Sequence, residues 1–142
     1  MRIYVAGSSK ERERARRAMR AVREMGHAVS HDWLSVIERA GAANEGLSIE
    51  AQLRVAAGDL AAVDQSHLLW LLAPETESRG AWVEYGYALA LGVQCIVSGP
   101  ESGRSIFSRL AVAVLPSDDE AAEWIAGVEG THHIRWTRSG GR

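Results

Sequence analysis

The order of strand-like and helix-like segments predicts an α/β domain with a parallel sheet of about five strands and helices on both faces. Two runs that suit buried strands, Arg2–Ala6 and Ser66–Leu72, each lead into a loop and then into a helical pattern. The second run is continuously apolar from Leu68, as expected of a central parallel strand that helices cover on both faces. In such sheets ligands bind beyond the carboxyl ends of the strands.

The first half of the chain begins with a β-branched and aromatic run, Arg2–Ala6, which ends at Gly7-Ser8-Ser9. We expect these three residues to turn the chain and cap the next helix, Lys10–Met25. Apolar residues recur there at three- and four-residue steps, arginines fill the other face, and Gly26 is placed to stop the helix. The next expected elements are a strand at His27–His31, a helix at Asp32–Ala40, an exposed loop at Gly41–Gly46 and a helix from a Ser48 cap to about Asp64.

The second half of the chain continues the alternation of strands and helices. Gly80 opens a helix that runs to Leu91, and Gly92 ends it. We then expect a strand at Val93–Val97, a turn-rich loop at Gly99–Gly103, a strand at Leu110–Leu115, a helix at Asp118–Gly127 and a short strand at His132–Trp136. The tail Ser139–Arg142 is expected to be disordered, so residues 1–138 are predicted to form a single domain.

Composition excludes several classes of protein. With 16 basic and 18 acidic residues the net charge is -2, so the chain lacks the positive field of a general nucleic-acid binder. Cys95 is the only cysteine, which excludes an internal disulfide and a multi-cysteine zinc site and points to the cytoplasm. No apolar run approaches the roughly 20 residues of a membrane span, so we expect no membrane partner.

The loop Gly7-Ser8-Ser9 offers backbone amides, two hydroxyls and a helix amino terminus, with Lys10 directly behind them. Such a loop favours an anion such as a phosphate. The same three residues are also an ordinary helix cap, and their spacing lacks the full glycine pattern of a dinucleotide fingerprint. From the loop alone, both interpretations stay open.

The segment Ser78–Ala90 places one carboxylate, Glu84, on an otherwise apolar helix just beyond a buried strand. The positive end of the helix dipole is expected to keep this carboxylate ionised even when it is partly desolvated. An ionised, partly dry carboxylate can act as a nucleophile or stabilise an oxocarbenium ion. The alternative is a glutamate that lies near the helix start for its dipole interaction alone.

Two other residues can reach the same pocket. Asp59 lies at the border of the helix face that packs on the sheet, although an ordinary solvent-exposed carboxylate fits the same periodicity. Tyr4 is a core residue whose hydroxyl needs a partner, and it is placed to hold Glu84. Trp33 and Trp82 are the tryptophans nearest the expected pocket, where either can stack on a base.

Two further patterns do not support a metal or a cofactor. Gly99–Ser105 resembles a Walker loop, but its spacing is one residue short and arginine replaces lysine. The pairs His31-Asp32 and His132-His133 lack the spacing of a helical metal pair. We therefore expect neither a metal nor a cofactor.

Taken together, three motifs resemble one known superfamily. These are Ile3-Tyr4-Val5-Ala6-Gly7-Ser8, Gly58-Asp59-Leu60 before an apolar strand, and Gly80 followed by Glu84-Tyr85-Gly86-Tyr87-Ala88. In order and spacing they resemble the nucleoside 2-deoxyribosyltransferase and 2'-deoxynucleoside 5'-monophosphate N-hydrolase superfamily from Arg2 to about Trp124. The resemblance implies a flavodoxin-like, or Rossmann-like, parallel sheet and an enzyme that attacks a base-sugar bond.

The resemblance also implies roles for individual residues. Glu84 matches the glutamate that attacks the anomeric carbon, Tyr4 the tyrosine that orients it, and Asp59 the candidate general acid. Ser78 favours the monophosphate hydrolase branch over the transferases. Ser108 matches a residue that a neighbouring subunit contributes, which implies a homodimer or higher homo-oligomer with shared sites. The expected substrate contacts are Gly7, Ser8, Ser9, Lys10, Trp33, Ser78, Arg79, Gly80 and Ser108.

The sequence departs from this superfamily at His67, where many relatives have an aspartate, and at Arg79, which is unusual beside the pocket. These departures concern the substrate more than the fold. Four functions stay open: a nucleotide N-glycosidase, a deoxyribosyltransferase, a TIR-like enzyme that cleaves NAD, and a module that binds a nucleotide without turning it over.

Overall fold

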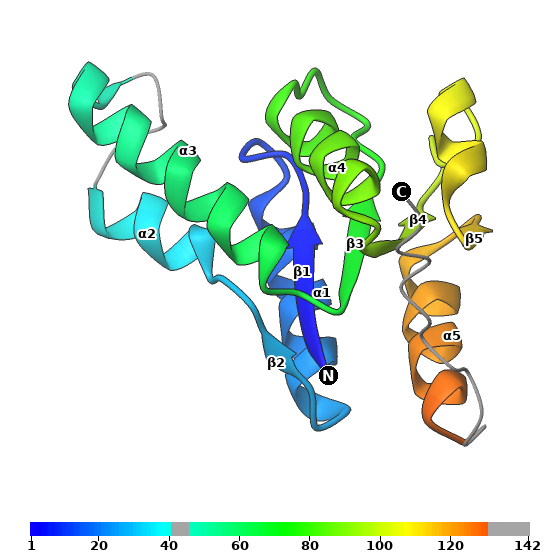
Figure 1. The fold of residues 1–142 in the computed structure, drawn as a ribbon. Helices are drawn as coiled ribbons and strands as arrows, with labels where there is room; N and C mark the ends of the chain where they lie inside the picture. The colour runs from blue at the N-terminus through cyan, green and yellow to red at the C-terminus, as the bar shows by residue number, and fades with distance from the viewer. Residues whose placement is uncertain (41–45, 131–142) are drawn as a thin grey trace, which may run out of the picture.

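A computed structural model describes residues 1–40 and 46–130 of the chain (Figure 1). Its centre is a sheet of five parallel strands. The strands are β1 (Arg2–Ala6), β2 (Ala28–Val29), β3 (Leu68–Leu72), β4 (Gln94–Ser98) and β5 (Ala113–Leu115), in the order β2-β1-β3-β4-β5. This is the strand order of flavodoxin-like sheets, so the predicted fold class is confirmed.

Helices cover both faces of the sheet. They are α1 (Arg12–Glu24), α2 (Trp33–Ala40), α3 (Ile49–Asp64), α4 (Gly80–Leu91) and α5 (Asp118–Gly130), together with a short 3-10 helix, η2 (Ile106–Leu110). α1 and α5 contact each other on one face, and α3 and α4 contact each other on the opposite face (Figure 1). α2 packs against α1. None of the helices among the described residues is long and apolar enough to cross a membrane.

The inner strands are buried because their side chains are apolar on both sides. All five residues of β3 are buried, and β1 is buried from Ile3 to Ala6. The two strands pair in parallel register from Ile3 with Leu68 to Ala6 with Leu71. Because β1 has β2 on one side and β3 on the other, the strand order reverses here, and a cleft opens beyond the carboxyl ends of these strands.

Local signals in the sequence set several helix boundaries. Ser48 caps α3, since its hydroxyl accepts a hydrogen bond from the Ala51 amide at 3.2 Å. α4 spans the predicted residues and ends at Gly92, whose φ of 72° is left-handed and therefore suits glycine. The apolar stripe of α1 is buried as its spacing predicts, with Ala15, Ala18, Met19 and Val22 facing the core.

The prediction that Gly7-Ser8-Ser9 caps α1 is wrong. The helix begins at Arg12, and its N-cap residue is Glu11, which makes no side-chain cap. The Ser8 hydroxyl instead accepts a hydrogen bond from the Lys10 amide, and the Ser8 carbonyl accepts one from the Glu11 amide. These bonds form a turn before the helix starts.

The edge strands differ most from their predicted bounds. β2 is shorter than His27–His31, because the His27 amide bonds back to the Val22 carbonyl and completes the end of α1. The predicted strand Leu110–Leu115 begins only at Ala113, because Leu110 belongs to η2. The predicted strand His132–Trp136, the predicted disordered tail and residues 41–45 of the predicted loop lie outside the described residues.

Candidate active site

A cavity of about 760 Å³ opens beyond the carboxyl ends of β1 and β3. Its walls come from the loop after β1, from α2 and α3, and from the start of α4. The predicted site residues that line it are Gly7, Ser8, Ser9, Lys10, Trp33, Asp59, Ser78, Arg79, Gly80 and Glu84. All the predicted site residues except Tyr4 and Ser108 therefore line one cavity. Tyr4 lies behind the wall of this cavity.

Glu84 enters the cavity from the second turn of α4 and is partly buried. Burial and the negative charge of Asp59 raise its pKa to about 8, and the Tyr4 hydroxyl acts in the opposite direction. The expectation that the helix dipole keeps Glu84 ionised is therefore wrong. Loss of hydration beside a second carboxylate outweighs the dipole.

Tyr4 is completely buried, and its ring belongs to the core. Burial raises the pKa of its hydroxyl, and the charges of Glu84 and Asp59 raise it further. The hydroxyl faces both carboxylates, yet it makes no hydrogen bond of standard geometry. A buried hydroxyl without a partner costs free energy, so its position between two acids calls for a functional explanation.

Asp59 reaches the cavity from α3 and carries an ionic partner that the sequence did not reveal. Its Oδ1 atom lies 3.4 Å from Nε2 of His31, which follows β2. Burial raises the pKa of Asp59, while a charge on His31 and the Tyr4 hydroxyl oppose this shift. The spacing of His31 spoke against a metal ligand, and its contact with Asp59 could not be predicted, because no local signal joins residues 28 positions apart.

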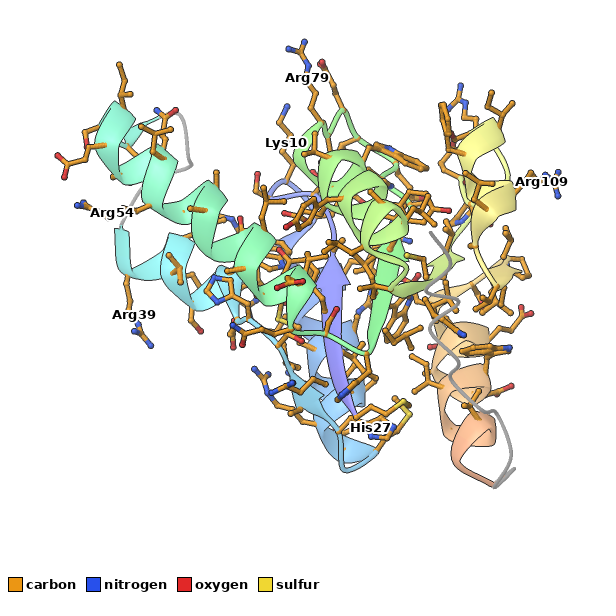
Figure 2. All side chains as sticks on the ribbon, in the orientation of Figure 1. Lys10, His27, Arg39, Arg54, Arg79 and Arg109 are labelled. Carbon is orange, nitrogen blue, oxygen red and sulfur yellow. The ribbon has the colours of Figure 1, made fainter. Side chains whose placement is uncertain are left out.

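The predicted phosphate contacts lie at the end of the cavity formed by the loop after β1 and the start of α4. Lys10 and Arg79 are both exposed there, and their side chains extend from the same end of the molecule (Figure 2). Arg79 pairs with Glu77 at 3.2 Å. The first turn of α4 has no acidic residue and no side-chain cap, so its amides are available to an anion.

Trp33 forms part of the cavity wall but offers little surface to a ligand. Its side chain is only 6% exposed, and its indole N–H donates to the Val5 carbonyl at 2.8 Å. A Cβ atom added at Gly7 would lie 3.8 Å from the Trp33 ring, so the loop after β1 passes close to this ring. Trp33 therefore supports the loop and presents little of its surface to the cavity.

No protein-family model matches the sequence, and no curated protein matches it. Among solved structures, the chain is similar to the CMP N-glycosidase BcmB of Clostridium botulinum. The two chains share 18% identity, the match covers 90% of this chain and 99% of the other, and the TM-score is 0.60. A likeness at this identity shows a shared fold.

The structure does not bring Ser108 to the cavity. Its side chain is completely buried in η2, and its hydroxyl has no hydrogen-bond partner among the described residues. Ser108 therefore does not line the cavity of its own chain, and its expected contact with a neighbouring subunit stays a prediction. Its neighbours face outward instead: Ile106 is 80% exposed and Phe107 is 59% exposed.

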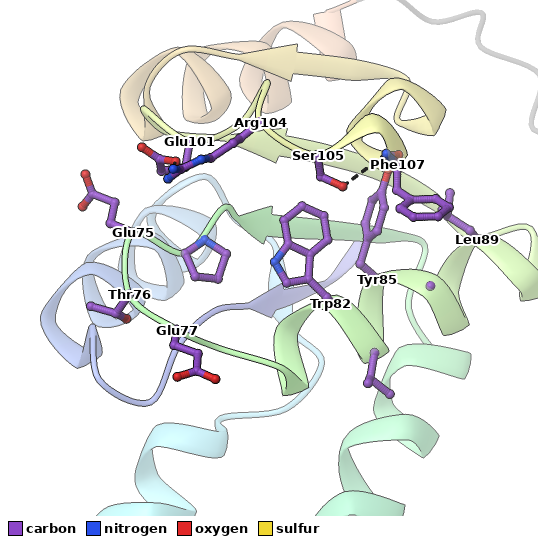
Figure 3. A pocket seen from close by; sticks show the side chains of 13 residues that line it. Glu75, Thr76, Glu77, Trp82, Tyr85, Leu89, Glu101, Arg104, Ser105 and Phe107 are labelled. Atoms are coloured by element: carbon purple, nitrogen blue, oxygen red, sulfur yellow. Dashed lines mark hydrogen bonds and ion pairs between the residues drawn. The ribbon is translucent and has the colours of Figure 1, made fainter.

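A second cavity, of about 780 Å³, lies between α4, the loop after β3 and the η2 region (Figure 3). Trp82 lines this cavity and packs edge-on against Tyr85, with ring centroids 5.7 Å apart. The expectation that Trp82 borders the pocket of Glu84 is therefore wrong, because Trp82 lines the second cavity and not the first. Neither Glu84 nor Asp59 lines this second cavity, and paired acids with raised pKa values favour the first cavity as the active site.

Across residues 1–40 and 46–130, no group of three or more His, Cys, Asp or Glu side chains is arranged to hold a metal ion.

Proposed function

We propose that the protein is an N-glycosidase that cleaves the base-sugar bond of a nucleoside 5'-monophosphate, with Glu84 as the nucleophile. The observation that carries the proposal is that Glu84 and Asp59 line one cavity beyond β1 and β3, with the buried Tyr4 hydroxyl beside both. Most glycoside hydrolases use a pair of carboxyl groups that flank the glycosidic bond to be cleaved. The fold shared with a CMP N-glycosidase makes CMP the first substrate to test.

In the proposed reaction one proton serves both acids. The raised pKa of Glu84 leaves it protonated at neutral pH, so it must lose this proton before it attacks the anomeric carbon. Asp59 faces the same Tyr4 hydroxyl and is placed to take the proton. The transfer creates a carboxylate nucleophile at Glu84 and an acid at Asp59 that can protonate the departing base.

The second half of the reaction releases the sugar. A water molecule attacks the anomeric carbon of the glycosyl-enzyme ester at Glu84, and Asp59, now ionised, accepts the proton of that water. The Glu84 carboxylate leaves, and sugar 5-phosphate is the product. The charge of His31 at 3.4 Å favours the ionised form of Asp59 that this step requires.

Features at the two ends of the cavity support a nucleotide as the substrate. At one end, the amides at the start of α4 and the cations of Lys10 and Arg79 suit a phosphate. At the other end, Ile37 and Val55 give an apolar wall against which a base can lie. Gln52 also lines the cavity; its amide nitrogen donates to the Leu47 carbonyl at 2.8 Å, and its amide oxygen can accept a hydrogen bond from a base.

We also propose a homo-oligomer that buries the apolar side chains of η2 and the residues after it. Ile106, Phe107, Leu110 and Val112 are each more than half exposed, which is unusual for a group of large apolar residues. Val83, 60% exposed, borders both cavities, so a second copy that covers this face would also border the active site. Sedimentation of the wild-type protein and of Phe107→Glu tests this, and a wild-type monomer would contradict it.

A chromatographic assay over a panel of nucleosides, nucleoside monophosphates and NAD tests the proposed function. A hydrolase releases free base and sugar phosphate from a monophosphate without any acceptor. A transferase releases base only when an acceptor base is added, and an NAD-cleaving enzyme releases nicotinamide. Binding without any product would contradict an enzymatic function.

A further inference from the structure

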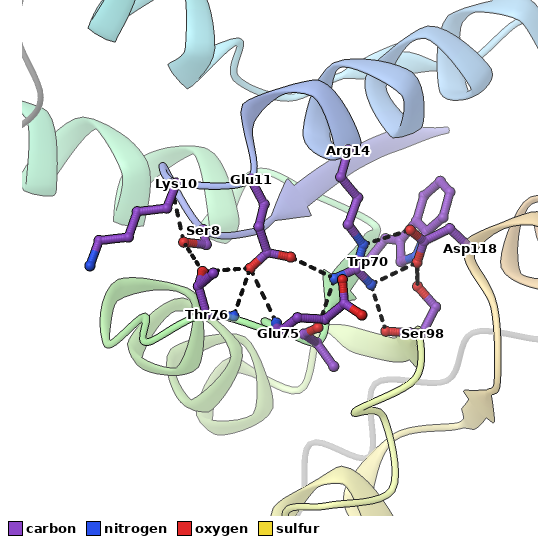
Figure 4. Close-up of polar contacts among 10 residues, drawn as sticks. Ser8, Lys10, Glu11, Arg14, Trp70, Glu75, Thr76, Ser98 and Asp118 are labelled. Atoms are coloured by element: carbon purple, nitrogen blue, oxygen red, sulfur yellow. Dashed lines mark hydrogen bonds and ion pairs between the residues drawn. The ribbon is translucent and has the colours of Figure 1, made fainter.

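Glu11 lies at the start of α1, and its carboxylate turns away from its own helix (Figure 4). Its Oε2 atom accepts hydrogen bonds from the amides of Glu75 and Thr76, at 3.1 and 3.2 Å, and from the Thr76 hydroxyl at 2.8 Å. Its side chain is only 13% exposed. Glu11 thus fills a small anion site that the loop after β3 forms with its own backbone.

The Thr76 hydroxyl connects this contact to the loop after β1. It lies 2.8 Å from the Glu11 carboxylate and 3.1 Å from the Ser8 hydroxyl. Because a carboxylate only accepts, the Thr76 hydrogen points to Glu11 and the Ser8 hydroxyl donates to Thr76. Three side chains therefore join the two loops that carry the expected phosphate contacts.

Arg14 holds Glu11 in this orientation. Its five N–H donors are all used: they bond to the carboxylates of Glu11 and Asp118 and to the carbonyls of Ala73 and Ser98. Asp118 in turn accepts from the Ser98 hydroxyl at 2.6 Å. A Cβ atom at Gly99, whose φ is 104°, would collide with the Arg14 guanidinium. The network therefore rests on buried, closely packed groups.

Burial raises the pKa of Glu11, but hydrogen bonds from Thr76 and Arg14 outweigh this effect and leave it below its ordinary value. The carboxylate is therefore ionised at neutral pH, and its hydrogen bonds are charge-assisted. Lys10 and Arg79 stay exposed at the cavity, while Glu11 and Asp118 share the single positive charge of Arg14 within the network. The charge of Glu11 thus strengthens its hydrogen bonds to the loop after β3, and Glu11 does not line the cavity.

We propose that Glu11 is a positioning residue that holds the first half of the loop between β3 and α4, and so sets the cavity wall formed by Glu77, Ser78 and Arg79. This inference rests on the proposed function for its kinetic part. Because Glu11 occupies the amides of Glu75 and Thr76, these amides are not donors for the substrate. The phosphate is directed instead to Ser9, Ser78 and the start of α4.

Three variants test this role, and each leaves Glu84, Asp59 and Tyr4 in place. Glu11→Gln keeps the side-chain volume and removes the charge, and Thr76→Val removes the hydroxyl at nearly constant shape. Glu13→Gln is the control, because Glu13 is 69% exposed and bonds only to Arg16 among the described contacts. Hydrogen exchange of backbone amides is followed by NMR, and KM and kcat are measured with CMP.

We expect the Glu75 and Thr76 amides to exchange at least about tenfold faster in Glu11→Gln, with KM raised about fivefold or more and kcat within about twofold. Thr76→Val should raise KM less, and Glu13→Gln should match the wild type in both measurements. Unchanged exchange in Glu11→Gln would overturn the proposal, as would faster exchange with unchanged KM. If the wild-type protein turns over no nucleotide, the proposed function fails, and the exchange rates alone decide whether Glu11 holds the loop.

Discussion

Nε2 of His31 lies 3.4 Å from Oδ1 of Asp59, so the segment after β2 brings an imidazole to the acid pair at the cavity. Glu84 and Asp59 each raise the pKa of the Tyr4 hydroxyl, which lies beside both. Three titratable groups, from β1, α3 and α4, thus interact in one small volume, and His31 lies beside one of them. Their protonation states depend on one another, so the pH dependence of activity and of stability tests the site.

His31→Gln should weaken catalysis and move its pH dependence. A charged His31 lowers the pKa of Asp59, so its removal raises that pKa and shifts the acid limb of the kcat/KM profile to higher pH. We expect kcat/KM at neutral pH to fall by about three- to tenfold. His67→Gln is the control, because His67 bonds to the Arg2 amide at the opposite end of the sheet. An unmoved acid limb would remove His31 from the mechanism.

Glu84→Gln should change how stability depends on pH. The pKa of Glu84 is about 8 in the folded protein against 4.5 for the unperturbed group. Between these values the folded state holds a proton that the unfolded state has lost, so stability falls as pH rises through this window. The Tm difference in favour of Glu84→Gln should grow from pH 5 to pH 8 and then level off. Parallel Tm curves would contradict the raised pKa, and Glu50→Gln on the exposed face of α3 is the matched control.

Tyr4→Phe should lower kcat by about ten- to a hundredfold while leaving Tm equal or higher, because the lost hydroxyl is buried without a standard hydrogen bond. Its removal also raises the pKa of Glu84, so the acid limb moves to higher pH. Tyr85→Phe gives the opposite pattern, since the Tyr85 hydroxyl donates to the Phe107 carbonyl at 2.8 Å. That variant should lose stability with near-normal kinetics. Normal kinetics in Tyr4→Phe would make Tyr4 a core residue only.

Local patterns in the sequence predicted the inner strands and the helix that carries Glu84. Leu68–Leu72 is wholly apolar, and α4 is bounded by glycines, so neither element needed tertiary information. Edge elements were less predictable: β2 has only two residues, and η2 replaces the start of a predicted strand. Short edge strands gain little from burial, and contacts made elsewhere in the fold decide their length.

The candidate site also contains some residues that the sequence predicted and others that it could not predict. The carboxyl ends of parallel strands meet at one edge, which allowed Glu84, Asp59 and the loop after β1 to be assigned to one cavity. His31 and Glu11 were missed because their partners lie far away in the sequence: Glu11 and Thr76 are separated by 65 positions. Ser108 does not line this cavity because tertiary contacts within its own chain bury it, and the sequence does not show which side chains such contacts bury.

A nucleoside monophosphate should be a better substrate than its nucleoside by at least about tenfold in kcat/KM, since each charge-assisted hydrogen bond contributes about 1.5 to 3 kcal/mol. Lys10→Gln and Arg79→Gln should raise KM for the monophosphate and leave KM for the nucleoside unchanged. Arg54→Gln is the control, because Arg54 pairs with Glu50 on the exposed face of α3. Equal efficiency on both substrates would contradict a phosphate subsite and favour the deoxyribosyltransferase alternative.

The role of Glu84 is tested most directly by the release of free base from a nucleoside monophosphate, measured by chromatography for the wild type and Glu84→Gln. The amide keeps the shape of the side chain and cannot form the glycosyl ester. We predict that base release falls by about a thousandfold or more, roughly 4 kcal/mol, while the affinity for the monophosphate stays within about tenfold. Base release by Glu84→Gln within about tenfold of the wild-type rate would show that Glu84 is not the nucleophile.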